Sequence, residues 1–326
     1  MKMSARARRA PAPTPDIVST LASPWIPGAE PQFIRSFSNH VYLLPAGQER
    51  LYLRITAGGH RSRAQLDSEL AWVEFLGQSG IAVARPVASR AGQWVHTSSQ
   101  DGTTFHASVL GEAAGEEFAR LTPSDSQGIF RTAGATMARL HAAGRRFIRP
   151  PDFRRFHWTE DRWARFADHV PPSEREAWAL YRELRSWSGS LSRDSNLFGL
   201  VHGDFTIMNL RILDGQISLF DFDSCCEHWY AYEIATFLHY FGGQDPAARR
   251  RIHDEVLSGY AEVAEPHPGL VESIPRFGQM RLLYSFLVFA EEWGFENLTP
   301  EQESYFALRR RLFTQPPTWP HVWPQV

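Results

Sequence analysis

The stretch VHGDFTIMNLRILDGQISLFDFD, residues 201–223, carries more chemical information than any other part of this chain. An acid, Asp204, is followed five residues later by an amide, Asn209, and two acids, Asp221 and Asp223, follow a short apolar run. The Asp-Gly dipeptide at 214–215 is a strong turn signal, so residues 210–213 and 217–220 are expected to pair as a hairpin. That hairpin would return Asn209 and Asp221 to one edge, beside Asp204.

The residue types at these positions suit phosphoryl transfer. Asp204 can orient or deprotonate an attacking hydroxyl, while the oxygens of Asn209 and Asp221 are hard ligands that suit magnesium on a nucleotide's phosphates. The alternative is that the acids only cap turns, and the complete spacing favours the site over that alternative. Asp223 has two open roles: it contacts a second metal or a cationic substrate, or it is purely structural.

Composition limits the classes of function. The chain has 326 residues with 43% hydrophobic content, which is enough for two packed units, and its net charge of −2 provides no overall field for nucleic acid or an anionic membrane. The two cysteines are adjacent, which disfavours a disulfide between them and cannot complete a zinc site, so they fit a reducing cytoplasm. The apolar stretch at 282–290 is too short to span a bilayer.

The pattern of apolar residues divides the chain into two parts. Residues 1–16 are expected to form a disordered tail, because they are basic and rich in proline and lack an apolar segment. Residues 17–110 predict a small antiparallel sheet with one helix at 62–78, and residues 111–326 predict a mainly helical unit. The helices expected in the second unit span 126–143, 173–188, 231–240, 245–263, 271–290 and 300–313. The role of residues 145–172 is not revealed by the sequence.

The motif in 201–223 resembles that of the aminoglycoside phosphotransferase and choline kinase-like family, distant relatives of protein kinases. The resemblance extends over most of residues 30–313 and implies an α+β, bilobal protein-kinase-like fold with an N-terminal nucleotide-binding lobe and a C-terminal catalytic and substrate-binding lobe. It implies that Asp204 is the catalytic base and that Asn209 and Asp221 bind Mg²⁺. It also implies ATP or GTP as the phosphoryl donor, and the sequence does not distinguish the two.

The segment from 221 to 235 is similar to the homoserine kinase-like and bacterial stress-response Ser/Thr kinase branch of that family. Two departures matter. Ser224 replaces an acid, and Glu233 replaces an aspartate that normally braces the catalytic loop by hydrogen bonds. The metal site is therefore expected to carry less negative charge than is usual in that branch.

In the N-terminal lobe, the resemblance places Arg54 where the family has its phosphate-pairing cation, with Glu69 of the next helix as its partner. The loop at 36–40 contains no glycine, so Ser38 and Asn39 are expected to cover the nucleotide through their side chains; the alternative is weak, altered or lost nucleotide binding. Adenine is expected to contact the backbone where the lobes join, at three residues: Ser108, Val109 and Leu110.

The resemblance extends to residues that would contact the phosphoryl acceptor. Glu291 and Glu292 lie where the family branch usually has a basic pair, and together with Glu227 and Asp223 they would favour a cationic acceptor if they face the cleft; the alternative is a solvated helix face. The aromatic residues expected as a wall for that acceptor, with core packing as the alternative, include Trp229, Tyr230, His157, Trp158 and Trp163.

The sequence thus predicts a kinase that transfers the γ-phosphoryl group of a magnesium nucleotide to a hydroxyl of a small molecule, such as a cationic antibiotic or an amino alcohol. An antibiotic acceptor would imply a role in antibiotic resistance. Two rival functions stay open: a protein Ser/Thr kinase of the stress-response type, and a pseudokinase that binds a nucleotide or ligand without turnover. No nucleic-acid or membrane partner is expected, and the oligomeric state is left open.

Overall fold

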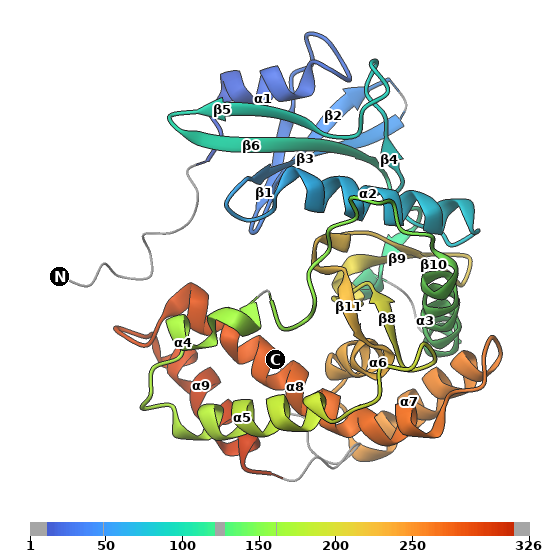
Figure 1. Cartoon of the computed structure of the whole chain (residues 1–326), viewed down its shortest axis with the longest axis vertical. Helices are drawn as coiled ribbons and strands as arrows, with labels where there is room; N and C mark the ends of the chain where they lie inside the picture. The colour runs from blue at the N-terminus through green and yellow to red at the C-terminus, as the bar shows by residue number, and fades with distance from the viewer. Residues whose placement is uncertain (1–11, 48, 121–127, 161, 316–326) are drawn as a thin grey trace.

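The computed structural model describes residues 12–47, 49–120, 128–160 and 162–315, so most of the tail expected at 1–16 lies outside the described residues. The chain forms a smaller N-terminal lobe above a larger helical lobe, with helix α2 (Arg63–Gln78) between them (Figure 1). The predicted α+β bilobal architecture is confirmed.

The N-terminal lobe is built on an antiparallel sheet. Apolar and polar residues alternate along β3 and β6, and within the described residues the strand order is β1-β2-β3-β6-β4, with β5 also paired to β6. The strands are β1 (Gln32–Ser36), β2 (His40–Ala46), β3 (Glu49–Ala57), β4 (Pro86–Val87), β5 (His96–Gln100) and β6 (Thr103–Gly111). β1 is the exposed edge strand of this sheet.

Two helices cover this sheet, although the sequence predicted one. Helix α2 begins with a capping box at Ser62, which accepts a hydrogen bond from the backbone of Gln65. Helix α1 (Pro15–Ala22) was not expected; it starts inside the predicted tail and packs with Trp25 against the apolar face of β2, β3 and β6. Pro15 stands in the first turn of α1, where a missing backbone N–H is harmless.

The C-terminal lobe combines long helices with two small sheets. Within the described residues, the strand order is β10-β9-β7 in one sheet and β11-β8 in the other. The strands are β7 (Glu116–Glu117), β8 (Phe198–Val201), β9 (Leu210–Leu213), β10 (Gln216–Leu219) and β11 (Cys226–Trp229). The helices are α3 (Ile129–Arg146), α4 (Phe166–His169), α5 (Arg175–Gly189), α6 (Tyr230–His239), α7 (Pro246–Ala261), α8 (Pro268–Trp293) and α9 (Pro300–Phe313).

The expected long helices are all present, and the start predicted at residue 126 for α3 lies outside the described residues. Helices α3 and α7 pack with their backbones in close approach: a Cβ atom added at Gly134 would overlap the carbonyl oxygen of Val256, and one added at Gly259 would overlap that of Arg131. None of the helices in the described part of the chain combines the length and the apolar character that crossing a bilayer requires.

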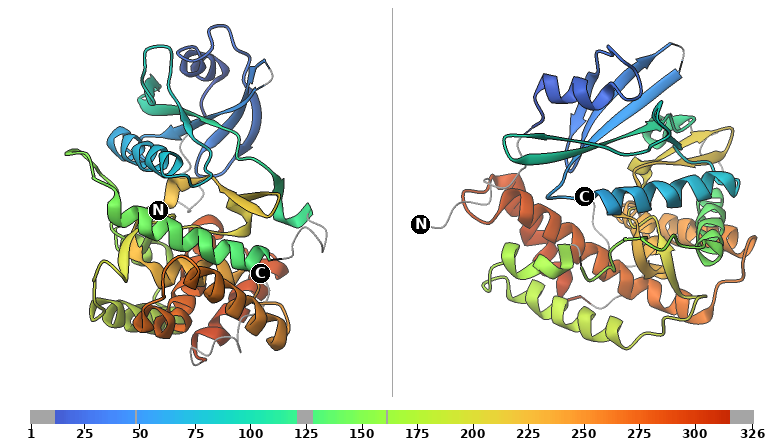
Figure 2. Two further views of the ribbon diagram at one scale, coloured as in Figure 1. Left: turned by 90° about the vertical axis from the view of Figure 1, so that its right-hand side faces the viewer. Right: turned by 45° about the horizontal axis from the view of Figure 1, so that its top comes forward.

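The two lobes share helix α2. Its residues Trp72, Val73 and Leu76 are buried in the large core of the C-terminal lobe, whereas the sheet of the N-terminal lobe has its own core under α1. Both views in Figure 2 show α2 lying along the junction of the lobes. This placement puts α2 beside the motif, since Arg155 donates both to the carbonyl oxygen of Gln65 in α2 and to that of Asp223.

Candidate active site

The loop that carries Asp204 follows strand β8 and turns sharply at Gly203. Gly203 has φ +80°, and a Cβ atom at this position would overlap the carbonyl oxygen of Ser224. Only glycine fits both the left-handed backbone and this close approach. The turn places Asp204 beside the segment that carries Asp221.

Glu233 of helix α6 fixes this loop through hydrogen bonds to its backbone. Its side chain is fully buried, and its Oε1 accepts hydrogen bonds from the backbone N–H groups of His202 (2.6 Å) and Gly203 (3.2 Å). Its Oε2 accepts from Nε2 of His141 at 2.7 Å, while Nδ1 of His141 accepts from the hydroxyl of Tyr260 at 3.0 Å. Burial lowers the pKa of His141, which favours the neutral ring. The longer acid at 233 therefore still braces the loop.

Asp204 is oriented from two sides. Its Oδ2 accepts from the side-chain amide of Asn209 at 2.8 Å, and its Oδ1 pairs with Nη2 of Arg281 at 3.0 Å. Arg281 comes from helix α8 and is nearly buried, whereas 32% of the Asp204 side chain remains exposed. The arrangement fixes the plane of a carboxylate that a ligand can still reach.

Asp221 stands at the exit of the hairpin and faces the same region. Its φ of 63° is in the left-handed region, and its Oδ2 lies 3.3 Å from Nη2 of Arg35, which reaches across from β1. Desolvation, and then the nearby charge of Asp223, raises the pKa of Asp221. A cation at this carboxylate would offset both effects, and Arg35 already places one there.

The donor set fits a hard divalent cation bound together with phosphates. Asn209 and Asp221 are linked through a hydrogen bond from the backbone N–H of Phe220 to the carbonyl oxygen of Asn209 at 3.1 Å. In the described part of the chain, no three His, Cys, Asp or Glu side chains converge on a metal-binding centre. Magnesium commonly takes one or two protein ligands and completes its shell with phosphate oxygens and waters, so two suffice.

The pairing expected between Arg54 and Glu69 is present. Nη1 of Arg54 on β3 donates to Oε1 of Glu69 on α2 at 2.6 Å, and both side chains are buried. Burial would lower the pKa of Arg54, but Glu69 and the more distant Asp223 and Asp221 raise it on balance. The role of this pair in holding phosphates stays a prediction.

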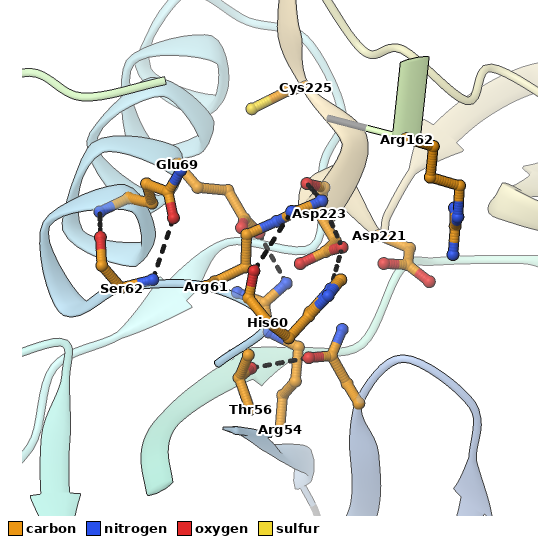
Figure 3. A network of polar contacts seen from close by, with 12 residues as sticks. Arg54, Thr56, His60, Arg61, Ser62, Glu69, Arg162, Asp221, Asp223 and Cys225 are labelled. Atoms are coloured by element: carbon orange, nitrogen blue, oxygen red, sulfur yellow. Dashed lines mark hydrogen bonds and ion pairs between the residues drawn. The ribbon is translucent and has the colours of Figure 1, made fainter. Parts of the chain in front are cut away.

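Asp223 is part of an ionic network that ties the lobes together (Figure 3). Its Oδ2 lies 2.9 Å from Nε2 of His60 and 3.2 Å from Nη2 of Arg61, and the residue is buried. Burial raises the pKa of this carboxyl, but Arg61 and His60 outweigh it and hold the pKa well below its usual range. The geometry therefore favours the structural role of Asp223 over a role at a second metal, because its Oδ2 is already held by His60 and Arg61.

Residues 145–172, whose role was not evident from the sequence, supply two arginines that bond to the motif and to helix α8. Nε of Arg155 donates to the carbonyl oxygen of Cys225, and its Nη2 donates to that of Asp223. Nε of Arg162 donates to Glu291 at 2.8 Å, and its Nη1 donates to the hydroxyl of Tyr284 at 3.1 Å. The segment thus links the motif to helix α8.

The loop at 36–40 joins β1 to β2, and the expected adenine contacts lie on β6. Oδ1 of Asn39 accepts from the hydroxyl of Thr56 at 2.7 Å, so this oxygen is engaged within the lobe. Val109 and Leu110 lie between β3 and β4, where sheet pairing uses their backbone groups. The roles of Ser38, Asn39, Ser108, Val109 and Leu110 stay predictions.

The expected acceptor residues require correction. Trp229 and Tyr230 are buried in the core, where Tyr230 stacks on His141 with ring centroids 4.1 Å apart, so they form no wall of a cleft. Glu227 pairs with Arg149 at 2.7 Å, and Glu291 pairs with both Arg162 and Arg165. Glu292 is exposed.

Because neighbouring arginines balance Glu227 and Glu291, these acids provide no excess negative charge for a cationic acceptor. The aromatic residues of the expected wall are also mostly core, since Trp158 and Trp163 are buried. The structure therefore does not bring the expected acceptor residues together around a free cleft.

Sequence reasoning missed five basic residues around the motif. They are Arg35, His60, Arg61, Arg155 and Arg281. Arg281 had a detectable signal, because a lone charged residue beside the apolar run at 282–290 needs a buried partner. Arg35 meets Asp221 only through tertiary folding, and the other three meet Asp223 or its carbonyl in the same way.

Together, the fold and the site define a phosphotransferase with the protein-kinase architecture. Residues 30–266 match the family described as the phosphotransferase enzyme family (APH), and the chain belongs to that family. Amicoumacin kinase from Bacillus subtilis (strain 168) is 25% identical over 294 residues, which cover 86% of this chain and 85% of that protein.

Solved structures agree with this assignment. Amicoumacin kinase hAmiN in complex with AMP-PNP, Ca²⁺ and Ami has a TM-score of 0.85 at 25% identity, covering 93% of this chain and 95% of its own. The microcompartment-associated aminopropanol kinase shares the fold, with a TM-score of 0.74 at 24% identity and coverage of 91% and 96%. The chain is a kinase that transfers a phosphate group to a hydroxyl of a small molecule.

Proposed function

We propose that this enzyme transfers the γ-phosphoryl group of magnesium-bound ATP to the hydroxyl of an amine-bearing small molecule, with Asp204 as the base. The observation that carries the proposal is the partly exposed Asp204 carboxylate, held by Asn209 on one oxygen and by Arg281 on the other. A base must be oriented yet reachable by the hydroxyl that it serves, and this carboxylate meets both conditions.

In the reaction, the acceptor oxygen forms a bond to the γ-phosphorus as the bond from that phosphorus to the β-phosphate oxygen breaks. The hydroxyl proton passes to Asp204, and ADP leaves with the electron pair of the broken bond. Asn209 and Asp221 would hold the divalent cation, which neutralises charge on the phosphates. Arg54 would contact the phosphates from the N-terminal lobe.

The donor and the cation are supported by the related amicoumacin kinase, whose structure contains AMP-PNP and Ca²⁺. We propose Mg²⁺ for this chain, because two oxygen ligands beside a phosphate site match its coordination. The two cysteines are free and buried, which suits the reducing cytoplasm where we place the reaction.

The acceptor class is supported by the relatives and not by the acids of helix α8. One relative is named for amicoumacin and another for aminopropanol, a compound that carries both an amine and a hydroxyl. The wall of the site near Asp204 is formed by Arg281 and Tyr284, with the Arg281 guanidinium 5.5 Å from the tyrosine ring centroid. An amine on the acceptor would therefore have to bind away from Arg281.

The test is a coupled assay of ADP release with candidate acceptors: aminopropanol, homoserine, choline-like alcohols, aminoglycosides and amicoumacin. We expect one amine-bearing alcohol to raise the rate above the acceptor-free background. Asp204→Ala should lower kcat by about 10²- to 10⁴-fold, the contribution of a positioned base. ATP affinity should stay within about twofold, because Asp204 contacts the acceptor rather than the nucleotide.

Asp254→Ala is the matched control, since Asp254 lies on the surface of α7 and is 65% exposed. Full turnover in Asp204→Ala would refute the assignment of the base. ATP binding without ADP release for any acceptor would instead indicate a nucleotide-binding protein without turnover. Labelled protein bands after incubation with radioactive ATP would indicate a protein kinase.

A further inference from the structure

The connection between β1 and β2 lacks the means by which kinase-type loops usually bind phosphates. Its sequence, Ser36-Phe-Ser-Asn-His40, has no glycine, and the backbone N–H of Phe37 is used within the loop, where it donates to the carbonyl oxygen of Asn39 at 3.1 Å. Asn39 also directs its side-chain oxygen to Thr56. The backbone N–H of Phe37 is therefore not free to bind a phosphate, and the bond to Thr56 fixes the orientation of the Asn39 side chain.

A bulge in β1 turns one arginine toward the cleft. Phe33 lies opposite Tyr42, but Arg35 lies opposite Val41, so Ile34 is an extra residue in the strand. In a regular strand Phe33 and Arg35 would share a face, and the bulge puts them on opposite faces. Phe33 contacts the ring of Tyr42, whereas Arg35 reaches Asp221 across the cleft.

The contact between Arg35 and Asp221 is a loose one. Nη2 of Arg35 lies 3.3 Å from Oδ2 of Asp221, and 55% of the Arg35 side chain is exposed. An exposed ion pair of this kind contributes little to stability, so the guanidinium can leave the carboxylate readily. The rest of its planar fork of donors matches the spacing of phosphate oxygens.

We propose that Arg35 is a phosphate-binding residue of this enzyme, which exchanges its contact with Asp221 for the terminal phosphates of the nucleotide when the metal-bound nucleotide enters. The inference rests on the proposed function, since it assumes that Asp221 binds the metal of a nucleotide. Arg35 then replaces, with one side chain, the backbone amides that a glycine-rich loop would provide. Before the nucleotide arrives, it competes with cations for Asp221.

If this exchange occurs, Arg35→Gln should weaken the binding of ATP but not the binding of a divalent cation alone. Arg35→Gln should weaken binding of ATP by about 10- to 100-fold, the loss of a charge-assisted hydrogen bond, while adenosine binding stays within twofold. Binding of Mn²⁺ alone, measured by electron paramagnetic resonance without nucleotide, should stay equal or become tighter, because a competing cation has been removed. Arg35→Lys should recover part of the ATP affinity, since an ammonium provides the charge without the fork.

Arg63→Gln is the matched control, because Arg63 is also an exposed, ion-paired arginine of the N-terminal lobe, 3.5 Å from Asp67. It should bind both ligands like the wild type. Equal loss of ATP and adenosine in Arg35→Gln would mean a general disturbance of the lobe and would overturn the proposal, as would unchanged ATP affinity. If the wild type itself binds no ATP, the proposed function fails first.

Discussion

Replacement of Glu233 tests how the catalytic loop is held. In Glu233→Ala, the backbone N–H groups of His202 and Gly203 and the Nε2–H of His141 lose their acceptor inside the core. An unsatisfied buried donor costs about 1–3 kcal/mol. Allowing for partial relaxation, we expect the free energy of unfolding to fall by about 3–5 kcal/mol.

Glu233→Gln should be much milder. The amide oxygen can still accept from both backbone N–H groups, and the amide NH₂ can donate to Nε2 of His141 if the ring moves its proton to Nδ1. The hydroxyl of Tyr260, now 3.0 Å from Nδ1, can then accept that proton's hydrogen bond. Only the charge assistance of the bonds is lost, so we expect a decrease of roughly 1–3 kcal/mol.

The assay is urea unfolding followed by tryptophan fluorescence, with the ¹⁵N chemical shifts of His141 reporting the tautomer. We also expect kcat to fall by about 100-fold in Glu233→Ala, because a shift of about 1 Å at Asp204 has that effect. A glutamine variant as unstable as the alanine variant, or one with an unchanged tautomer, would refute the reasoning.

Three further changes test the packing and the charges. Gly259→Ala should lower the free energy of unfolding by about 1–3 kcal/mol, because its Cβ atom would overlap the carbonyl oxygen of Arg131. Gly189 has open space around it, so the control Gly189→Ala should be neutral or slightly stabilising. Thermal unfolding of both variants measures the difference. The free energy of unfolding of the wild type should fall as the pH falls from 7 to 5. Burial lowers the pKa of His228 well below 6.5, so the unfolded chain binds more protons than the folded one. In urea titrations, His228→Asn should therefore reduce the dependence of this free energy on pH by up to about 1.4 kcal/mol per pH unit. Asp223→Asn should cost about 3–5 kcal/mol in the same titrations, because it leaves the buried guanidinium of Arg61 without its carboxylate. Normal stability with lost Mg²⁺ affinity would instead identify Asp223 as a metal ligand.

The sequence contained much of the architecture because local pattern and fold agree in the long helices. Helix α9 has the bounds that its apolar periodicity predicted, and the hairpin of β9 and β10 turns at the expected Asp-Gly pair. Helix α1 was missed because it is short and begins with proline in a basic tail. Its place depends on tertiary packing against the sheet rather than on its own helical propensity.

The candidate site was predictable in its spacing but not in its counter-charges. Asp204, Asn209 and Asp221 follow from a continuous motif, so chain geometry alone brings them near one another. The partner of Asp223 comes from residue 61 and that of Asp204 from residue 281, and no local pattern encodes such distant pairs. Trp229 and Tyr230 were expected in a binding wall but are buried in the core. The sequence cannot separate these two cases, because aromatic residues serve both.

Because helix α2 packs in two cores, it couples the unfolding of the two lobes. Trp72 and its neighbours are part of the C-terminal core, while the same helix carries Glu69 to Arg54 of the sheet. Removing either lobe would expose one face of α2 to water. The two lobes should therefore melt in one cooperative transition, and a fragment of residues 17–110 should not fold without the remainder of the chain.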